Sequence, residues 1–368
     1  MPRAAVVYEH QGPVEIVEVE LSALGPHDVR VAIGASGVCH SDVAAQTGAL
    51  AFPTPIILGH EGAGTVVAVG SDVTSVAPGD HVALSAIISC GRCRPCVEGT
   101  PNLCEWGLPI IFSCAQPDGA LRATDPSGRG LYQFASLGTL AEEVIVPEVA
   151  TVPIPVDVPF EVAALVGCGV LTGVGAVLNR AKVRVGDTVA VIGCGGVGLN
   201  VVQAAAMAGA STIVAVDREE WKLQMAREFG ATDAVDATAV DVVAAVRERT
   251  GGRGADVVFE CVGNGALIRQ AWDAAGIAGT VVAIGVAGSD EVVSLPAQEL
   301  STSEKTLMSC LYGTSRPRLD MPRYLQLYRQ GKLRLDELVT RRYSMDQVSE
   351  AVADLNASRN ARGVVVMG

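Results

Sequence analysis

Residues 188–200 read TVAVIGCGGVGLN, an apolar strand-like run followed by a glycine-rich turn and the start of a helix. Within this stretch Gly193, Gly195 and Gly198 form the pattern G-x-G-x-x-G. The pattern is weak in isolation, but between a strand and a helix it is typical of a loop that binds the pyrophosphate of a dinucleotide. Asp217 ends the next apolar run, TIVAVD, 19 residues after Gly198. A carboxylate there can bind the ribose hydroxyls, which favours NAD over NADP, although the guanidinium of Arg218 could partly accommodate a 2′-phosphate.

Strands and helices alternate downstream of this motif. EEWKLQMAREFG carries Trp221, Met225 and Phe229 at helical spacing, and further helices are expected around residues 240–250 and 267–275. The segments DVVFECVG, TVVAIG and KTLMSC have the composition of strands. We therefore expect a parallel, doubly wound sheet of about six strands, the number in a full dinucleotide-binding domain.

The sequence before this alternating region follows a different pattern. Up to about residue 150, short β-rich segments such as PVEIVEVE, GAGTVVAVG and EEVIV are separated by Gly, Pro and Asp. This spacing predicts an all-β, partly closed architecture with irregular loops. After Tyr312 come a helix-like PRYLQLYRQGKL and a strand-like ARGVVVMG, which could return to the first domain. A chain of 368 residues is long enough for two hydrophobic cores.

Charge and hydropathy exclude several classes of partner. The formal net charge is -13, so the field of the protein repels nucleic acid and anionic membrane surfaces. Residues 188–215 carry no charge and are long enough to span a bilayer, but their change from a β-rich run to an Ala-rich helix is typical of a buried βαβ unit. The opening MPRAAVVYEHQ lacks the apolar core of a secretory signal, so we expect a cytoplasmic protein.

Ten cysteines in a chain of this size, with no export signal apparent, favour metal ligation over disulfides. Cys90, Cys93, Cys96 and Cys104 lie in CGRCRPCVEGTPNLC, where the spacing C-x2-C-x2-C-x7-C can present four thiolates to a tetrahedral ion. Zinc in a structural role is preferred, because four sulfur ligands leave no open coordination position. An iron–sulfur cluster and a set of reactive thiols are the alternatives.

A second metal centre is predicted from three separated residues. Cys39 lies in GVCHSD, His60 in ILGHEGAG and Cys168 in VGCGVLTG. Each one alone is more typical of a packed cysteine or a hydrogen-bonded histidine. Together, two thiolates and one imidazole with a vacant fourth position are the ligand set of a zinc that performs chemistry.

These motifs, in the order GVCHSD, GHEGAG, the four-cysteine loop, GCGVLTG and GCGGVG, resemble the zinc alcohol dehydrogenases over nearly the whole chain. The resemblance implies an α/β fold with a GroES-like, β-rich catalytic domain at residues 1–169 and 313–368. A Rossmann domain with a doubly wound parallel sheet would take residues 170–312. It also implies an NAD-dependent enzyme with two zinc ions per subunit, one catalytic and one structural. The long segment between Cys104 and Cys168 resembles the long-subunit branch, in which homodimers are usual.

The resemblance assigns roles to residues around the catalytic zinc. Cys39, His60 and Cys168 would hold the ion, with Glu61 behind it. Asp42 would orient a ligand and tune the charge of the metal. Capping of its own loop is an equally good explanation for Asp42.

Proton transfer and cofactor binding complete these assignments. Ser41 would take up the alcohol proton and pass it toward the nicotinamide ribose, which His40 would contact, although Ser41 read alone is an ordinary turn serine. The expected cofactor contacts are Gly193, Gly195, Gly196, Val197, Gly198, Asp217, Lys222, Thr172, Val286 and Arg362. Lys222 and Arg362 could equally be surface charges.

The chain departs from the family along the proton route and at an anion contact. Ala44 stands where class I enzymes often have a relay histidine, so the proton must leave by another route. Leu108 stands where class III enzymes use an arginine to bind a glutathione adduct, which argues against glutathione-bound formaldehyde as substrate. Arg122 or Arg129 could supply a different anion contact.

The substrate pocket is expected to be open and apolar. Ala86 occupies the usual aromatic position and should widen the pocket, while Ile110, Ile111 and Val286 add apolar surface. We therefore expect primary alcohols, including aromatic or longer-chain ones, and their aldehydes. The alternatives are a class III-type thiol-adduct formaldehyde dehydrogenase, a zinc-free quinone or enoyl reductase, and a non-catalytic protein that binds zinc and nucleotide.

Overall fold

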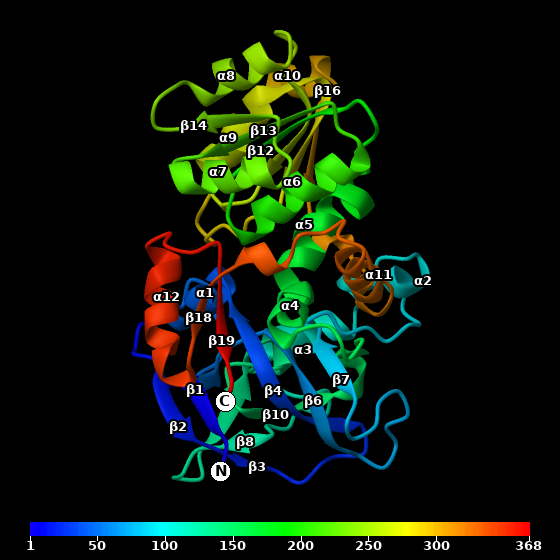
Figure 1. The fold of residues 1–368 in the computed structure, drawn as a ribbon, viewed down its shortest axis with the longest axis vertical. Coiled ribbons are helices and arrows are strands. Elements are labelled where there is room, and N and C mark those ends of the chain that lie inside the picture. Colours follow the sequence, from blue (N-terminus) through cyan, green and yellow to red (C-terminus); the bar gives the residue numbers. More distant parts are fainter. The chain divides into compact units, whose positions relative to one another are not determined.

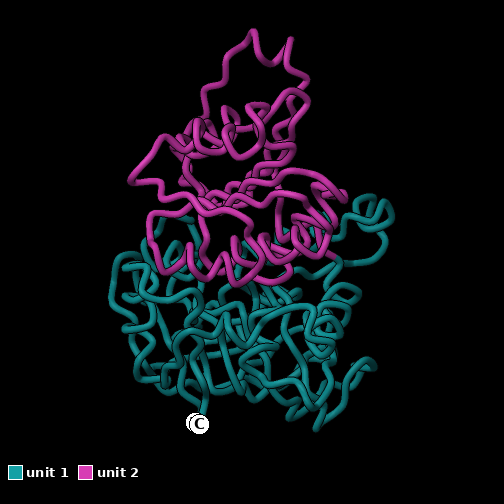
Figure 2. The backbone as a smooth tube through the Cα atoms, turned by 45° about the horizontal axis from the view of Figure 1, so that its top comes forward, with its two compact units in different colours: residues 1–168, 316–368 teal, residues 169–315 magenta.

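The computed structural model describes all 368 residues, which form two compact units (Figure 2). Unit 1 comprises Met1–Cys168 and Arg316–Gly368, and unit 2 comprises Gly169–Ser315. The C-terminal segment belongs to unit 1 because its last strand, β19 (Arg362–Val366), pairs antiparallel with β4 (Asp28–Val38) near the start of the chain.

A seven-stranded sheet is the centre of unit 1. Its order is β11-β7-β6-β4-β19-β18, and β10 pairs with the first half of β4. The remaining strands are β6 (Glu61–Val69), β7 (His81–Leu84), β10 (Glu143–Pro147), β11 (Thr151–Pro153) and β18 (Val339–Tyr343). The side chains of β4 are mostly small or β-branched and mostly buried, so neighbouring strands can pack against it on both sides.

A second sheet in unit 1 has six short strands in the order β2-β1-β5-β9-β8-β3. They are β1 (Arg3–Val7), β2 (Glu15–Glu18), β3 (Glu20–Leu21), β5 (Ile56–Ile57), β8 (Ala123–Thr124) and β9 (Gly130–Gln133). The predicted β-rich architecture is confirmed. Helices also interrupt and follow it: α1 (His40–Thr47), α2 (Arg94–Val97), α3 (Gly107–Ser113), α4 (Phe160–Leu165), α11 (Pro317–Arg329) and α12 (Val348–Asn356).

Short helices such as α1 were not predicted from the sequence, because its eight residues are too few to show a clear apolar period. Local capping defines the ends of α1. Cys39 is the N-cap residue of α1, and its backbone N–H donates to the carboxylate of Asp42 at 2.9 Å. Gly48 ends the helix in the left-handed conformation, with φ of 79°. This cap places the side chain of Cys39 at the junction between β4 and α1.

Unit 2 is a parallel sheet in the order β14-β13-β12-β15-β16-β17 (Figure 1). Its strands are β12 (Thr188–Ile192), β13 (Thr212–Asp217), β14 (Asp233–Asp236), β15 (Ala255–Glu260), β16 (Ala275–Ala283) and β17 (Thr306–Ser309). The helices are α5 (Leu171–Gly175), α6 (Gly196–Ala208), α7 (Glu220–Glu228), α8 (Val242–Arg249), α9 (Gly265–Ala274) and α10 (Ala297–Thr302). This order is that of the predicted doubly wound dinucleotide-binding fold.

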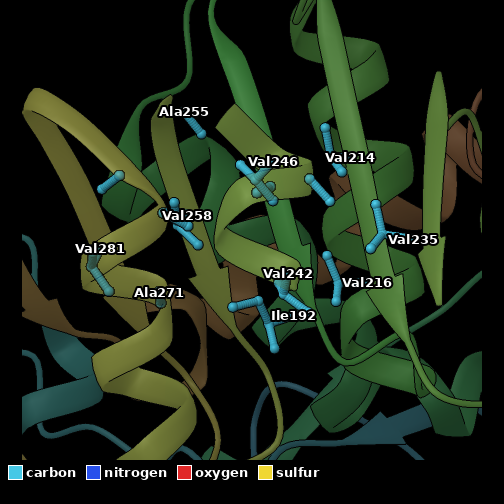
Figure 3. Close-up of a cluster of buried hydrophobic side chains, with 14 of the residues drawn as sticks. Ile192, Val214, Val216, Val235, Val242, Val246, Ala255, Val258, Ala271 and Val281 are labelled. Atoms are coloured by element: carbon cyan, nitrogen blue, oxygen red, sulfur yellow. The ribbon is translucent and has the colours of Figure 1, made fainter. Parts of the chain in front are cut away.

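The core of unit 2 packs strand residues against helices α8 and α9 (Figure 3). Val214, Val258 and Val281 are completely buried on the sheet, and Val246 of α8 meets them from the helix layer. Strands of a parallel sheet are covered on both faces, which explains their nearly uninterrupted apolar sequences. Trp272 on α9 is also completely buried in this cluster.

One helical stretch, Phe160–Ala181, is long and apolar enough to cross a membrane by length and composition. In its most apolar window 89% of the residues are buried inside the protein, as in the core helix of a soluble protein, so this is weak evidence for a membrane span. The uncharged residues 188–215 weighed in the sequence analysis form instead β12, α6 and the start of β13.

Truncation of Trp272 is expected to destabilise unit 2. Trp272→Ala should lower the free energy of unfolding by about 3–5 kcal/mol, because it empties a completely buried site. Trp272→Phe is the matched control: it keeps most of the apolar volume and mainly loses the bond from the indole N–H to Glu299, 2.9 Å long. Urea unfolding followed by circular dichroism measures both. Similar losses for the two variants would show that packing around Trp272 contributes little.

Candidate metal centres and cofactor site

Cys39, His60 and Cys168 come from three separate parts of unit 1 and meet in one buried cluster. Their ligating atoms, together with a carboxylate oxygen of Glu61, all lie within 4.8 Å of one another. Cys39 follows β4, His60 immediately precedes β6, and Cys168 lies in a π-helical turn (Val166–Val170) after α4. The structure thus brings together the three side chains that the sequence analysis named.

Two glycines let these segments approach each other. Gly37 on β4 pairs with Glu61 on β6, and a Cβ at Gly37 would lie 2.2 Å from Glu61 Oε2. A Cβ at Gly167 would lie 2.5 Å from the backbone oxygen of Leu84, at the end of β7. A side chain at Gly37 would therefore displace the carboxylate of Glu61, and one at Gly167 would push the turn that carries Cys168 away from β7.

The cluster fits a metal ion because its polar atoms are incompletely satisfied by protein. His60 Nε2 and Glu61 Oε2 are buried and have no hydrogen-bond partner. Buried polar atoms normally have partners, since an unpaired one costs about 1–3 kcal/mol. An imidazole nitrogen beside two thiols is a donor set suited to zinc, which would give the unpaired nitrogen of His60 its partner.

Asp42 orients this donor set. Its Oδ1 accepts the backbone N–H of Gly59 at 2.9 Å and lies 3.3 Å from His60 Nδ1, while its Oδ2 accepts the N–H of Cys39. With Nδ1 directed at Asp42, Nε2 is the nitrogen that faces the two sulfurs. The two roles weighed for Asp42, loop capping and histidine orientation, are thus performed by one side chain.

Charges within the cluster are closely coupled. The hydrogen bond with Cys168 lowers the pKa of Cys39 well below its usual value, and the same contact raises the pKa of Cys168. Burial lowers the pKa of His60, but Asp42 and Cys39 outweigh burial and leave this pKa well above its usual value. A metal must displace these protons, so binding should release protons and weaken as the pH falls.

Arg362 on β19 is buried behind the cluster and forms an ion pair with Glu61 Oε1. Burial raises the pKa of Glu61 to about 7, against the opposing effect of the guanidinium. From the sequence, Arg362 was expected at the cofactor. In unit 1 its side chain is only 4% exposed and is directed to Glu61, so a cofactor contact by Arg362 stays a prediction.

The four-cysteine loop forms a second cluster in unit 1. Its members are Cys90, Cys93, Cys96 and Cys104, whose sulfurs lie within 4.8 Å of one another. Backbone N–H groups point at the sulfurs: Cys93 N donates to Cys90 Sγ, and Gly107 N donates to Cys104 Sγ, each at 3.3 Å. The N–H groups of Arg92 and Cys93 lower the pKa of Cys90 to about 6. Four sulfurs with backbone donors around them match a closed zinc site.

The glycine-rich loop of unit 2 adopts the conformation that its sequence predicts. Gly193 has a φ of 91°, and a Cβ at Gly198 would lie 1.8 Å from Gly193 O, so helix α6 packs against the loop only without a side chain there. A Cβ at Gly195 would point into open space. Gly195 is the N-cap residue of α6 and provides no side-chain cap, which leaves the first N–H groups of the helix available to an anion.

Asp217 connects the end of β13 to this loop. Its Oδ2 accepts the N–H of Cys194 at 2.7 Å, and its Oδ1 accepts the N–H groups of Arg218 and Glu219. Among the other expected contacts, Lys222 lies over the ring of Trp221, Thr172 is buried in α5 and Val286 is 62% exposed after β16. All of them belong to unit 2.

An aromatic side chain beside the metal cluster was missed by the sequence analysis. The ring of Phe134 stands edge-on to His60, with 5.1 Å between ring centroids, and Phe52 stands edge-on to Phe134 at 5.0 Å. Phe134 follows β9 in a stretch without a metal-ligand motif, so only the fold reveals its contact with His60. Ala86 is completely buried, and its effect on pocket width stays a prediction.

The two arginines considered as anion contacts for class III-type chemistry have different surroundings in the structure. Arg122 is buried and bonds to the carboxylates of Asp28 and Asp118, each with a contact of 2.6 Å, so its charge is already neutralised. The exposed Arg129 lies over the ring of Tyr8.

Comparisons with known proteins agree with these features. Residues 25–156 match the alcohol dehydrogenase GroES-like domain family, and residues 196–330 match the zinc-binding dehydrogenase family. The chain is 40% identical over 367 residues to the NDMA-dependent alcohol dehydrogenase of Amycolatopsis methanolica, covering 99% of this chain and 98% of that protein. It is 36% identical over 370 residues to alcohol dehydrogenase B of Mycobacterium tuberculosis, covering 99% and 97%.

Among solved structures, benzyl alcohol dehydrogenase from Acinetobacter calcoaceticus matches with a TM-score of 0.94 and 31% identity, covering 100% of this chain and 99% of that one. The protein therefore belongs to the zinc-containing alcohol dehydrogenase family. It is an oxidoreductase that acts on an alcohol by hydride transfer, as predicted.

Removal of the charge on Asp42 is expected to weaken zinc binding at the Cys39–His60–Cys168 cluster by about 10–100-fold. In Asp42→Asn the amide orients His60 less strongly than the carboxylate does. Zinc retained after dialysis against increasing chelator measures the effect. Asp80→Asn is the control, because exposed Asp80 also accepts a backbone N–H, from Ala77 at 2.8 Å, but lies outside both cysteine clusters. Equal retention in the two variants would contradict a role for Asp42 at the metal.

Proposed function

We propose that this protein interconverts primary alcohols, including aromatic and longer-chain ones, and their aldehydes with NAD as the hydride carrier. The observation that supports this most directly is the buried cluster of Cys39, His60 and Cys168, in which His60 Nε2 has no protein partner. Three protein ligands leave a fourth position for substrate, whereas a structural zinc takes four. The aromatic edge of Phe134 next to His60 supports an apolar substrate.

The proposal includes two zinc ions per chain, one in each cluster. A zinc held by Cys39, His60 and Cys168 supplies a Lewis acid that favours loss of the alcohol proton near neutral pH. Asp42 keeps His60 in the orientation that ligation requires. Arg362 compensates the buried charge of Glu61 beside the cluster. The four-cysteine loop holds the structural zinc, where it would brace an otherwise irregular segment.

Ser41 is proposed to accept the alcohol proton. Its hydroxyl is half-buried at the start of α1, and its Oγ lies 4.0 Å from Cys39 Sγ, so it stands at the edge of the metal cluster. His40 is exposed next to it and offers the proton a way toward solvent that does not need a histidine at position 44. Ala44 cannot take part in proton transfer.

NAD rather than NADP is the proposed cofactor. The free N–H groups at the start of α6 suit the pyrophosphate, and the open space above Gly195 allows its close approach. Asp217 would repel a 2′-phosphate and bind the ribose hydroxyls instead. Arg218 is exposed and lies 4.0 Å from Glu219, which offsets its attraction for a phosphate.

The alternatives have less support. A thiol-adduct formaldehyde dehydrogenase needs a free cation near Leu108, and the charge of Arg122 is taken up by two carboxylates. A zinc-free reductase has no use for the buried Cys39–His60–Cys168 set, and neither has a non-catalytic nucleotide-binding protein. A cytoplasmic location and a homodimer are also part of the proposal, and the mass in solution tests the second.

A panel of alcohols and aldehydes, assayed with NAD and NADP in parallel and alongside zinc analysis, tests the proposal. We expect NAD-linked turnover, a preference for aromatic or longer-chain alcohols over ethanol, and two zinc ions per chain. Each alcohol is also assayed with added NDMA, because a relative at 40% identity is described as dependent on it. Absence of turnover with every alcohol and acceptor, in a protein that contains both zinc ions, would contradict the proposal.

Ser41→Ala should lower kcat by about 10²–10⁴-fold and leave the dissociation constant for NADH within about twofold, because only proton transfer loses a participant. Steady-state kinetics and NADH titration measure the two effects. Ser71→Ala is the control, since Ser71 is an exposed loop serine bonded to Asp72. If Ser41→Ala lowered turnover and NADH affinity by the same factor, Ser41 would be a structural residue.

A further inference from the structure

Glu260, the last residue of β15, is a completely buried acid that the proposed chemistry does not use. Its Oε1 accepts the backbone N–H groups of Val262 at 2.9 Å and Gly263 at 2.8 Å. Its Oε2 is buried without any hydrogen-bond partner. Burying a carboxylate costs free energy unless hydrogen bonds compensate it, so its bonds to the backbone are the feature to explain.

The backbone around Glu260 joins two loops at the end of the sheet. The side chain holds the turn 261–264, which leads into α9, while the main-chain oxygen of Glu260 accepts Ile284 N at 2.9 Å and Gly285 N at 3.1 Å. The loops touch backbone to backbone: a Cβ at Gly285 would lie 1.9 Å from Gly263 N. Glu260 therefore holds the turn 261–264 through its carboxylate and the loop that begins at Ile284 through its main-chain oxygen.

Each of these loops presents an exposed apolar side chain. Val262 is 54% exposed and Val286 is 62% exposed, although both are large hydrophobic residues. Val262 Cγ2 lies 2.6 Å from the point where a Cβ on Gly193 would stand, so Val262 covers the first glycine of the phosphate-binding loop. β12 and β15 are adjacent, and the strand order reverses between them, which is where ligands bind in doubly wound folds.

We propose that Glu260 is a positioning residue of the dinucleotide site, whose buried carboxylate fixes the turn 261–264 so that Val262, beside the loop that carries Val286, forms an apolar wall for the bound cofactor. This inference rests on the proposed use of NAD by the glycine-rich loop. Glu260 acts through hydrogen-bond geometry and touches no reacting atom.

The carboxylate suits this task better than an apolar residue would. Val262 N and Gly263 N would lose their acceptor if the side chain were removed, and Gly263 has a φ of 90°, so the turn depends on outside bonds to keep its shape. Burial raises the pKa of Glu260, and the N–H groups of Gly263 and Val262 act against this rise. An isosteric glutamine keeps an acceptor oxygen in the same place.

The test compares four variants of the full-length, zinc-loaded protein with the wild type. Glu260→Gln retains the side-chain acceptor oxygen, and Glu260→Ala removes it. Val262→Ala shortens the exposed apolar side chain and leaves the buried carboxylate unchanged. Glu291→Ala is the matched control, because the exposed Glu291 also accepts a backbone N–H of this region, from Gly265 at 2.9 Å, but does not hold the turn 261–264. Calorimetric titration with NADH gives affinities, and thermal unfolding is recorded on the same samples.

We expect Glu260→Ala to weaken NADH binding by about tenfold or more, the effect of losing roughly 1.4 kcal/mol. Glu260→Gln should bind NADH within about threefold of wild type, because it keeps the acceptor oxygen, and Glu291→Ala should bind within about twofold. Val262→Ala should weaken NADH binding about threefold or more with an unchanged melting temperature. The KM for alcohol at saturating NAD and the zinc content should not change.

Wild-type affinity in Glu260→Ala, or a loss in Glu260→Gln as large as in Glu260→Ala, would overturn the inference. If Glu260→Ala does not fold, Val262→Ala decides, since unchanged NADH affinity in that stable variant would show that the turn presents nothing to the cofactor. A wild-type protein that binds no NADH would instead contradict the proposed function, so the two failures are distinguishable.

Discussion

Gly37 on β4 pairs with Glu61 on β6, and the metal centre depends on this register. The pairing brings the end of one strand beside the start of the next, so that Cys39 and His60 lie together although 20 residues separate them in the sequence. A shift of one residue would turn Glu61 to the other face of the sheet and would move His60, which precedes it, relative to Cys39. The absence of a side chain at Gly37 allows Glu61 to lie against it, as a Cβ would come within 2.2 Å of Oε2. The position of the metal ligands thus depends on the backbone pairing of β4 and β6.

The buried charges of this centre are held in place by the same sheet. β19 pairs with β4 on the side opposite β6, and it carries Arg362 from near the end of the chain to Glu61. A buried carboxylate without a partner would destabilise the fold by several kcal/mol. Because Asp42, Glu61 and Arg362 are each engaged within unit 1, the thiols and the imidazole can lie together in a buried interior.

Two acids have comparable places in unit 2. Asp217 ends β13 and Glu260 ends β15, so they flank the central strand β12 at its carboxyl edge. Each accepts backbone N–H groups from adjoining loops, Asp217 from the glycine-rich loop and Glu260 from the turn before α9. Loops at the end of a parallel sheet lack ladder hydrogen bonds, and carboxylates provide acceptors in their place. The shape of the edge is therefore determined by side chains of the strands.

The sequence by itself determined the doubly wound sheet, the glycine-rich loop and the four-cysteine cluster, because apolar periodicity, glycine spacing and ligand spacing are local properties of the chain. It also named Cys39, His60 and Cys168, but through order and resemblance rather than through any derivation of their distance. The short helices α1 to α3 were missed, since helices of eight residues or fewer are too short to show a clear apolar period. Only the tertiary structure decided that the ring of Phe134 contacts His60. The same holds for the ion pairs of Arg122 with Asp28 and Asp118, and of Arg362 with Glu61. These contacts join residues far apart in the chain, and their existence depends on strand order and register, which no local pattern specifies.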